Sequence, residues 1–218
     1  MENQSMNIIN HPLQDKKWIK TQTKKTHIVW HGSYGRTKYS NGKATDTIIR
    51  WNNLAEKYGA PYLIDRDGTI YKTFDDTEWI YHLNIPTTRG CYDKLSVPIA
   101  VANEQQLIKV GGRYFAFEYD HITNLYTGPT LSKKWRRYEW YAKLDDPQVD
   151  ALIELTLDIA RRHNINPIFL ASNEWEPKAW EKATIFTHAV TKREVNDLFI
   201  EPWVIDKIKA AGITVVDS

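Results

Sequence analysis

The feature that most constrains the fold is a pair of short apolar runs, each of which leads into a histidine. The first run covers residues 26–31 and ends in His31. The second covers residues 183–187 and is followed directly by His188. Runs of this length, rich in β-branched and aromatic residues, predict buried strands. Because side chains alternate along a strand, His31 is expected on the face opposite Trp30.

The remaining elements predict helices and hairpins around these strands. Apolar residues recur at helical spacing over residues 46–58, and Asp-Pro at 146–147 opens the clearest helix. A last short helix is expected over residues 201–212. Asp-Arg-Asp-Gly at 65–68 is the strongest hairpin signal, because Asp-Gly tolerates a tight turn, and Gly111-Gly112 predicts a second hairpin. This mixture predicts a single α/β domain with a central mixed β-sheet flanked by helices.

Composition narrows the class of protein. A chain of 218 residues with 42% hydrophobic residues suits one globular domain. A net charge of +2 gives no case for nucleic acid as a partner. The one cysteine, Cys91, excludes an internal disulfide and fits synthesis in a reducing compartment. Residues 1–17 lack the apolar core of a signal peptide, and no apolar run is long enough to span a bilayer.

The two strand-end histidines suggest a metal site. Asn196 and Asp197 follow His188 closely and could supply an oxygen ligand. Two imidazoles and one oxygen can hold zinc with a fourth position open, which is the arrangement of a metal-dependent hydrolase. The alternative is that both histidines are polar side chains that only end buried strands.

Several blocks, taken in their order along the chain, resemble a known family. It is the zinc-dependent N-acetylmuramoyl-L-alanine amidase family, which includes phage endolysins, cell-wall recycling enzymes and peptidoglycan recognition proteins. The blocks are residues 28–32, the hairpin 62–71, the stretch 79–84 with its following Ser96–Ile99, and Thr187-His188. The resemblance covers about residues 26–205. It implies an amidase-like domain over residues 26–218, a lead-in segment over residues 1–25 and an insertion at about 105–145.

The resemblance also implies a zinc site. Its ligands would be His31, His188 and a third residue eight to ten positions after the second histidine. Asp197 is preferred over Asn196, because a carboxylate is a far stronger zinc ligand than a neutral amide. His82 falls in a block that resembles the cleft wall of the family, and it is expected to line the substrate cleft.

The proton-handling residues of the family are not matched. Its glutamate and tyrosine correspond here to Ala100 and Ala60. Glu104 has the strand parity of Ala100, and Tyr62 has that of Ala60, so either side chain is expected on the same face as the residue it would replace. Glu104 is the candidate for catalysis, and Tyr62 is the candidate for substrate binding.

A cation near the third ligand is the other candidate catalytic group. The family's lysine corresponds to Val195, and Lys192 or Arg193 is expected to replace it in stabilising an oxyanion.

Three functions follow as hypotheses. The first is zinc-dependent cleavage of the amide between N-acetylmuramic acid and L-alanine by a phage lysin, which is made in the host cytoplasm and acts on the cell wall. The second is a non-catalytic peptidoglycan-binding module, suggested by Ala60 and Ala100. The third is a structural or regulatory protein that uses the insertion, with its basic and aromatic run 133–141, to contact a virion or host protein.

Overall fold

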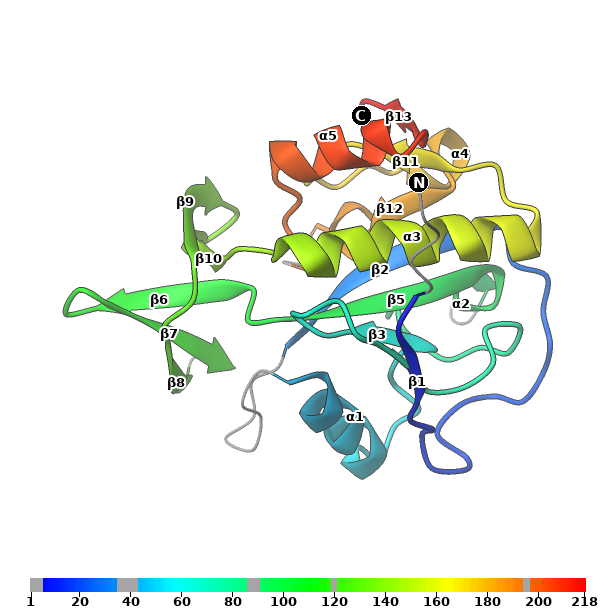
Figure 1. Ribbon diagram of the computed structural model, residues 1–218, viewed down its shortest axis with the longest axis horizontal. Coiled ribbons are helices and arrows are strands. Elements are labelled where there is room, and N and C mark those ends of the chain that lie inside the picture. The colour runs from blue at the N-terminus through cyan, green and yellow to red at the C-terminus, as the bar shows by residue number, and fades with distance from the viewer. Residues whose placement is uncertain (1–5, 35–42, 86–90, 119–120, 194–196) are drawn as a thin grey trace.

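The computed structural model describes residues 6–34, 43–85, 91–118, 121–193 and 197–218. Two β-sheets organise these residues: an eight-stranded sheet in the body of the molecule and a five-stranded sheet that projects from one end (Figure 1). Within the described ranges, no helix is both long enough and apolar enough to cross a membrane.

The large sheet is mixed, as the sequence predicts. Its strands run in the order β1-β4-β3-β5-β2-β12-β11-β13. Their bounds are β1 Ile8–Asn10, β2 His27–Tyr34, β3 Tyr62–Ile64, β4 Ile70–Lys72, β5 Ser96–Asn103, β11 Ile168–Leu170, β12 Ile185–Thr187 and β13 Thr214–Val216. Only β3 and β4 pair antiparallel, as the expected hairpin around residues 65–68. The parallel pairing of β1 with β4 joins part of the N-terminal lead-in to the sheet.

Helices cover both faces of this sheet. Their bounds are α1 Ala44–Asn53, α2 Cys91–Leu95, α3 Asp146–His163, α4 Ala179–Lys182 and α5 Pro202–Ala210. Helices α3 and α5 pack on one face and bury the largest apolar cluster. Helices α1 and α4 contribute to smaller clusters on the other face. Asp145 occupies the N-cap position of α3 without a side-chain cap hydrogen bond, Pro147 lies in the first turn, and Asn164 ends the helix in the left-handed conformation.

The central strand β2 divides its side chains between the two faces. Trp30 is fully buried in the cluster under α3, and its indole Nε1 donates to Thr156 Oγ1 of that helix at 3.0 Å. His31 pairs in register with Ala100 of β5, which belongs to the cluster that includes α1 residues. Two adjacent residues of β2 therefore lie on opposite faces of the sheet: Trp30 in the apolar core under α3, and His31 on the other side.

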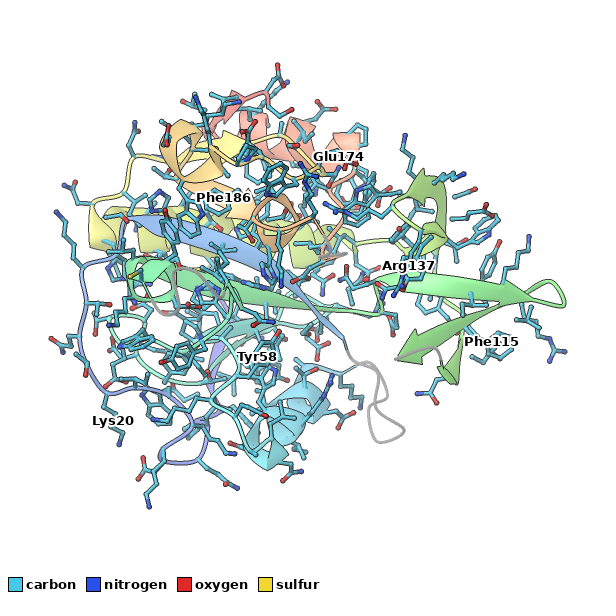
Figure 2. All side chains as sticks on the ribbon, turned by 180° about the vertical axis from the view of Figure 1, so that it is seen from behind. Lys20, Tyr58, Phe115, Arg137, Glu174 and Phe186 are labelled. Atoms are coloured by element: carbon cyan, nitrogen blue, oxygen red, sulfur yellow. The ribbon has the colours of Figure 1, made fainter. Side chains whose placement is uncertain are left out.

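The second sheet forms a projection that we call the arm, residues 106–142. Its strands are β6 Gln106–Val110, β7 Arg113–Glu118, β8 His121–Tyr126, β9 Thr130–Trp135 and β10 Tyr138–Ala142. All pair antiparallel, and the expected Gly111-Gly112 hairpin joins β6 to β7. Figure 2 shows Phe115 on the projecting part.

The base of the arm packs on the body of the molecule. Trp135 and Tyr141 form a cluster with Ala189, and Phe199 packs against it. The indole of Trp135 donates to the backbone oxygen of Asn173 at 3.0 Å.

Candidate metal centre

The topology brings the two strand-end histidines together. Strands β2 and β12 are parallel neighbours, with Thr187, the last residue of β12, in register with Trp30 in the middle of β2. His31 follows Trp30, and His188 follows Thr187. Their imidazole ring centroids are 4.6 Å apart. Residues separated by more than 150 positions therefore share one site, because each follows a member of the same in-register pair on two parallel strands. His188 directly follows the end of β12, but His31 does not end its strand as expected, since β2 continues to Tyr34.

Asp197 completes the cluster. Its Oδ2 lies 3.1 Å from His31 Nδ1 and 3.0 Å from His188 Nδ1. Its other oxygen, Oδ1, accepts the backbone N–H of Gly32, which fixes the carboxylate between the rings. The three potential ligand atoms lie within 4.8 Å of one another, and all three residues are buried. The alternative ligand Asn196 lies outside the described residues.

The electrostatics suit a cation. Burial alone would raise the pKa of Asp197, but contacts with the rings of His188 and His31 outweigh burial and hold that pKa at about 2. Burial lowers the pKa of His31 despite the neighbouring carboxylate. Asp197 is therefore ionised at neutral pH, and the neutral form of His31, which can bind a metal, is favoured.

This donor set fits zinc. Two imidazole nitrogens and one carboxylate oxygen are the three protein ligands found in catalytic zinc sites, in which the fourth position is open to water or substrate. His31 also lines a cavity of about 950 Å³, which gives the cluster an open side. His31, His188 and Asp197 are the described residues that could hold the ion.

The cavity lies between α1, the loop after it and residues 81–85. Figure 2 shows Tyr58, one of its lining residues, in the loop beyond α1. Ala60 and Ala100 also line it, at the positions where the resemblance led us to expect proton-handling groups.

His82 lines the cavity, and its ring also contacts His31 of the His31-His188-Asp197 cluster. Its Nδ1 lies 2.9 Å from His31 Nε2, and its Nε2 lies 2.9 Å from Ser96 Oγ. Burial lowers the pKa of His82 well below its ordinary value, so its charged form is strongly disfavoured. The backbone oxygen of the next residue, Leu83, lies 3.0 Å from His188 Nε2.

Tyr62 does not lie on the expected face. It belongs to the apolar cluster under α3, whereas Ala60 belongs to the cluster on the α1 side. The tyrosine hydroxyl donates to Asp76 at 3.2 Å. Strand β3 begins only at Tyr62, so strict alternation does not extend back through Pro61 to Ala60.

Glu104 is held at the base of the arm. It forms an ion pair with Arg66, which also bonds Asp145 at 2.7 Å, and it does not contact the three clustered residues in the described part of the chain. Strand β5 ends at Asn103, so the expected parity does not carry Glu104 to the cavity.

Of the two candidate cations, only Lys192 contacts a residue that lines the cavity. Lys192 is half-buried, and its Nζ donates to the backbone oxygen of Asn84, a cavity residue, at 3.4 Å. The guanidinium of Arg193 lies over the Trp175 ring at 4.2 Å. Val195 lies outside the described residues.

Sequence reasoning missed two buried residues behind the site. Asp93 of α2 accepts the backbone N–H groups of His82 and Leu83, and Ser96 opens β5. The signal for Ser96 was its place in one of the resembling blocks. Asp93 carries no local motif, because its role depends on a contact across ten or eleven residues.

The fold is an α/β domain with a buried His-His-Asp cluster, and the comparisons with known proteins place it in a family. The family model described as N-acetylmuramoyl-L-alanine amidase matches residues 21–194, so the chain belongs to that family and is an amidase. No curated protein matches it in sequence. Asp197 lies three residues beyond the matched range.

Solved structures share the fold at low sequence identity. The catalytic domain of XlyA is 13% identical, with 94% of this chain and 98% of that chain covered and a TM-score of 0.52. A mutant endolysin from Bacillus subtilis is 12% identical, with coverage of 95% and 97% and a TM-score of 0.51. The PlyG catalytic domain is 10% identical, with coverage of 87% and 82% and a TM-score of 0.51. At these identities the likeness concerns the fold, and it confirms the expected central sheet with flanking helices.

Proposed function

We propose that this protein is a zinc-dependent lysin that cleaves the amide between the lactyl group of N-acetylmuramic acid and the L-alanine of the stem peptide. The observation that carries the proposal is the convergence of His31, His188 and Asp197 beside a cavity of about 950 Å³. The family match supports peptidoglycan as the substrate. The endolysin among the similar structures supports a lysin role, and our proposal includes an origin in a phage.

Zinc bound here would supply a Lewis acid for the lactyl carbonyl and would lower the pKa of a bound water. The chain supplies the geometry for this chemistry. The Gly32 N–H holds one oxygen of Asp197, which leaves the other oxygen directed at both Nδ1 atoms. Outer contacts of both Nε2 atoms hold the imidazole planes. A site held in this way loses little entropy on binding its ion.

Lys192 is the cation that we propose for the oxyanion. Its contact with the backbone oxygen of Asn84, which lines the cavity, supports this role.

The test combines metal analysis with a product assay. The wild-type protein is expected to bind one zinc ion per chain and to release muropeptides with new N-terminal alanine from purified peptidoglycan. His188→Gln removes one imidazole and should lose both properties. His27→Gln is the matched control, because His27 lies on β2 but contacts the Trp180 oxygen instead of the cluster; it should keep both. Absence of product from zinc-loaded wild type over a range of pH would contradict the catalytic proposal.

A second candidate is a peptidoglycan-binding module on the same fold. Ala60 and Ala100 favour it, because neither can move a proton and both line the cavity. Sedimentation with insoluble peptidoglycan separates the candidates: binding of zinc and wall without product supports the module, whereas product release supports the enzyme.

A further inference from the structure

The base of the arm contacts the chain directly after each of the three candidate metal ligands. The residues that follow the ligands are Gly32, Ala189 and Leu198. Two side chains make the contacts: Gln105, just before the arm, and Arg136, in the turn between β9 and β10. Polar side chains therefore join the arm to all three parts of the candidate metal centre.

Asp197 is the ligand whose position depends most on such contacts. His31 lies within β2, and His188 begins a short 3-10 helix directly after β12. Asp197 lies in residues 197–201, which belong to no helix or strand. The next residue, Leu198, has a φ of 56°, which is unfavourable for a residue with a side chain. Contacts between elements must therefore hold this segment in place.

Gln105 supplies one of these contacts. Its Oε1 accepts the backbone N–H of Leu198 at 2.9 Å, and the glutamine is only 3% exposed. Gln105 also has a left-handed backbone, with a φ of 58°, and its carbonyl oxygen accepts the N–H of Ala142 at 2.8 Å. Ala142 is the last residue of β10. The end of the arm thus fixes the residue that holds the chain after Asp197.

The amide group of Gln105 also packs against Gly32. A Cβ at residue 32 would overlap with this amide, so glycine permits the close approach. The Gly32 N–H is the donor to Asp197 Oδ1. Gln105 therefore contacts both the donor residue and the residue after the acceptor in the hydrogen bond that holds Asp197.

The turn between β9 and β10 makes the remaining contacts. Arg136 Nη2 donates to the backbone oxygen of Ala189, which is fully buried, at 3.1 Å. The Trp135 indole donates to the backbone oxygen of Asn173 at 3.0 Å. The Asn173 side chain in turn accepts the N–H of Ile200 at 2.7 Å and donates to its oxygen at 2.9 Å. This turn therefore supports both chain segments that leave the site.

We propose that Gln105 and Arg136, at the base of the arm, are positioning residues that hold the three candidate ligands in place for a metal ion. The arm is then a part of the metal centre as well as a projection from it. The identity of the metal as zinc rests on the proposed function. The placement of Asp197 by Gln105 does not depend on any metal.

Gln105→Met is the main test, made in the full chain. Methionine keeps the length of the side chain and loses the Oε1 acceptor. It also removes Nε2, for which the described residues offer no hydrogen-bond acceptor, so the variant should fold. Zinc affinity, measured by calorimetry, should fall by about 10–100-fold. In the metal-free protein, hydrogen exchange of the Gly32 amide should become about tenfold faster, because Asp197 is held less firmly against it.

Gln148→Met is the matched control. Gln148 is also a fully buried glutamine, but its side chain donates to the backbone oxygens of Ile64 and Ala102 instead of the segments at the site. This variant should lose stability and keep the zinc affinity and the Gly32 exchange rate of wild type.

Arg136→Met is a second, independent variant. It should change both measurements in the same direction as Gln105→Met, by a smaller factor of about threefold to tenfold. Arg136→Lys keeps a donor for the Ala189 oxygen and should recover most of this loss. A residue that only stabilised the fold would change neither measurement in folded molecules.

The proposal is overturned if folded Gln105→Met keeps the zinc affinity of wild type, or if its Gly32 exchange changes no more than that of Gln148→Met. Should Gln105→Met not fold, the same two measurements on Arg136→Met decide. A wild type that binds no zinc, with faster Gly32 exchange in Gln105→Met, would contradict the proposed function and leave this inference standing.

Discussion

The two faces of the large sheet differ in what their side chains do, and the contrast is sharpest between Trp30 and His31. Trp30 is fully buried in an apolar cluster, and its one polar atom is satisfied by Thr156. His31 is also buried, yet it contacts an ionised carboxylate and a second histidine. The α3 face contributes stability through packing, whereas the cavity face also carries the buried polar cluster for which we propose a metal ion. Substitutions of neighbouring residues can therefore separate effects on the stability of the fold from effects on metal binding and activity.

The largest effect on stability is expected for Trp30→Ala. Removal of a fully buried indole leaves a cavity under α3, and the free energy of unfolding should fall by about 4 kcal/mol. Urea denaturation measures this change. Zinc affinity of the molecules that remain folded should match wild type. A loss of less than about 1 kcal/mol would show that the α3 face does not carry the stability assigned to it.

A smaller effect, dependent on pH, is expected at the edge of the same face. Burial raises the pKa of Asp76, but His163 and Arg162 outweigh it and hold that pKa at about 2. Because this pKa lies below the unfolded value of about 4, the contribution is present above pH 4 and lost as pH falls through 2. The stability difference between wild type and Asp76→Asn should shrink by about 2 kcal/mol between pH 5 and pH 2, as followed by denaturation at each pH. A constant difference would contradict the assignment.

Glu104→Gln tests whether Glu104, at the base of the arm, takes part in catalysis. The substitution weakens the ion pair with Arg66, which keeps Asp145 as a partner, so the loss of stability should be about 1 kcal/mol. Peptidoglycan hydrolysis should stay within about twofold of wild type, since a barrier change of that size is well under 1 kcal/mol. A hundredfold loss of activity in a folded variant would restore Glu104 as a catalytic candidate.

The smallest effect on metal-free stability is expected for His31→Gln. The glutamine amide can still donate one hydrogen bond within the cluster, so the change should be under about 1 kcal/mol. Zinc at 100 times its Kd should stabilise wild type by about 2.7 kcal/mol, and it should not stabilise the variant. Thermal melts with and without zinc measure both quantities. Equal stabilisation of the two proteins would remove His31 from the metal site.

Much of the large sheet was predictable because its strands are buried. The apolar runs before His31 and His188, the hairpin at residues 65–68 and the helix opened by Asp146-Pro147 all correspond to elements of the structure. In the arm, the sequence predicted the hairpin of β6 and β7 from Gly111-Gly112 but not the strands β8, β9 and β10. The pairing in the arm shifts register between Phe115 and Phe117 and between Tyr138 and Trp140, and such irregularities break the two-residue alternation that marks a strand.

The site was predictable only in part. His31 and His188 could be proposed from the ends of apolar runs, and Asp197 from the chemistry of carboxylates. His31 in fact lies within β2, which continues to Tyr34. The face on which Tyr62 lies depends on where β3 begins, and the position of Glu104 depends on where β5 ends. Hydrophobic periodicity does not predict such strand boundaries to the exact residue. The support from Asp93 and Ser96 depends on hydrogen bonds between elements, and these have no periodic signature.

The two ends of the arm meet at a single place. The Ala142 N–H donates to the Gln105 oxygen at 2.8 Å, and the Asn103 amide donates to the Lys143 oxygen at 2.9 Å. A tight connection between residues 105 and 142 would therefore bridge the gap, and this junction is a natural point for grafting a different module onto the enzyme. Any replacement must also shield Ala189 and Phe199, so the graft would lie beside His188, which precedes Ala189 in the chain.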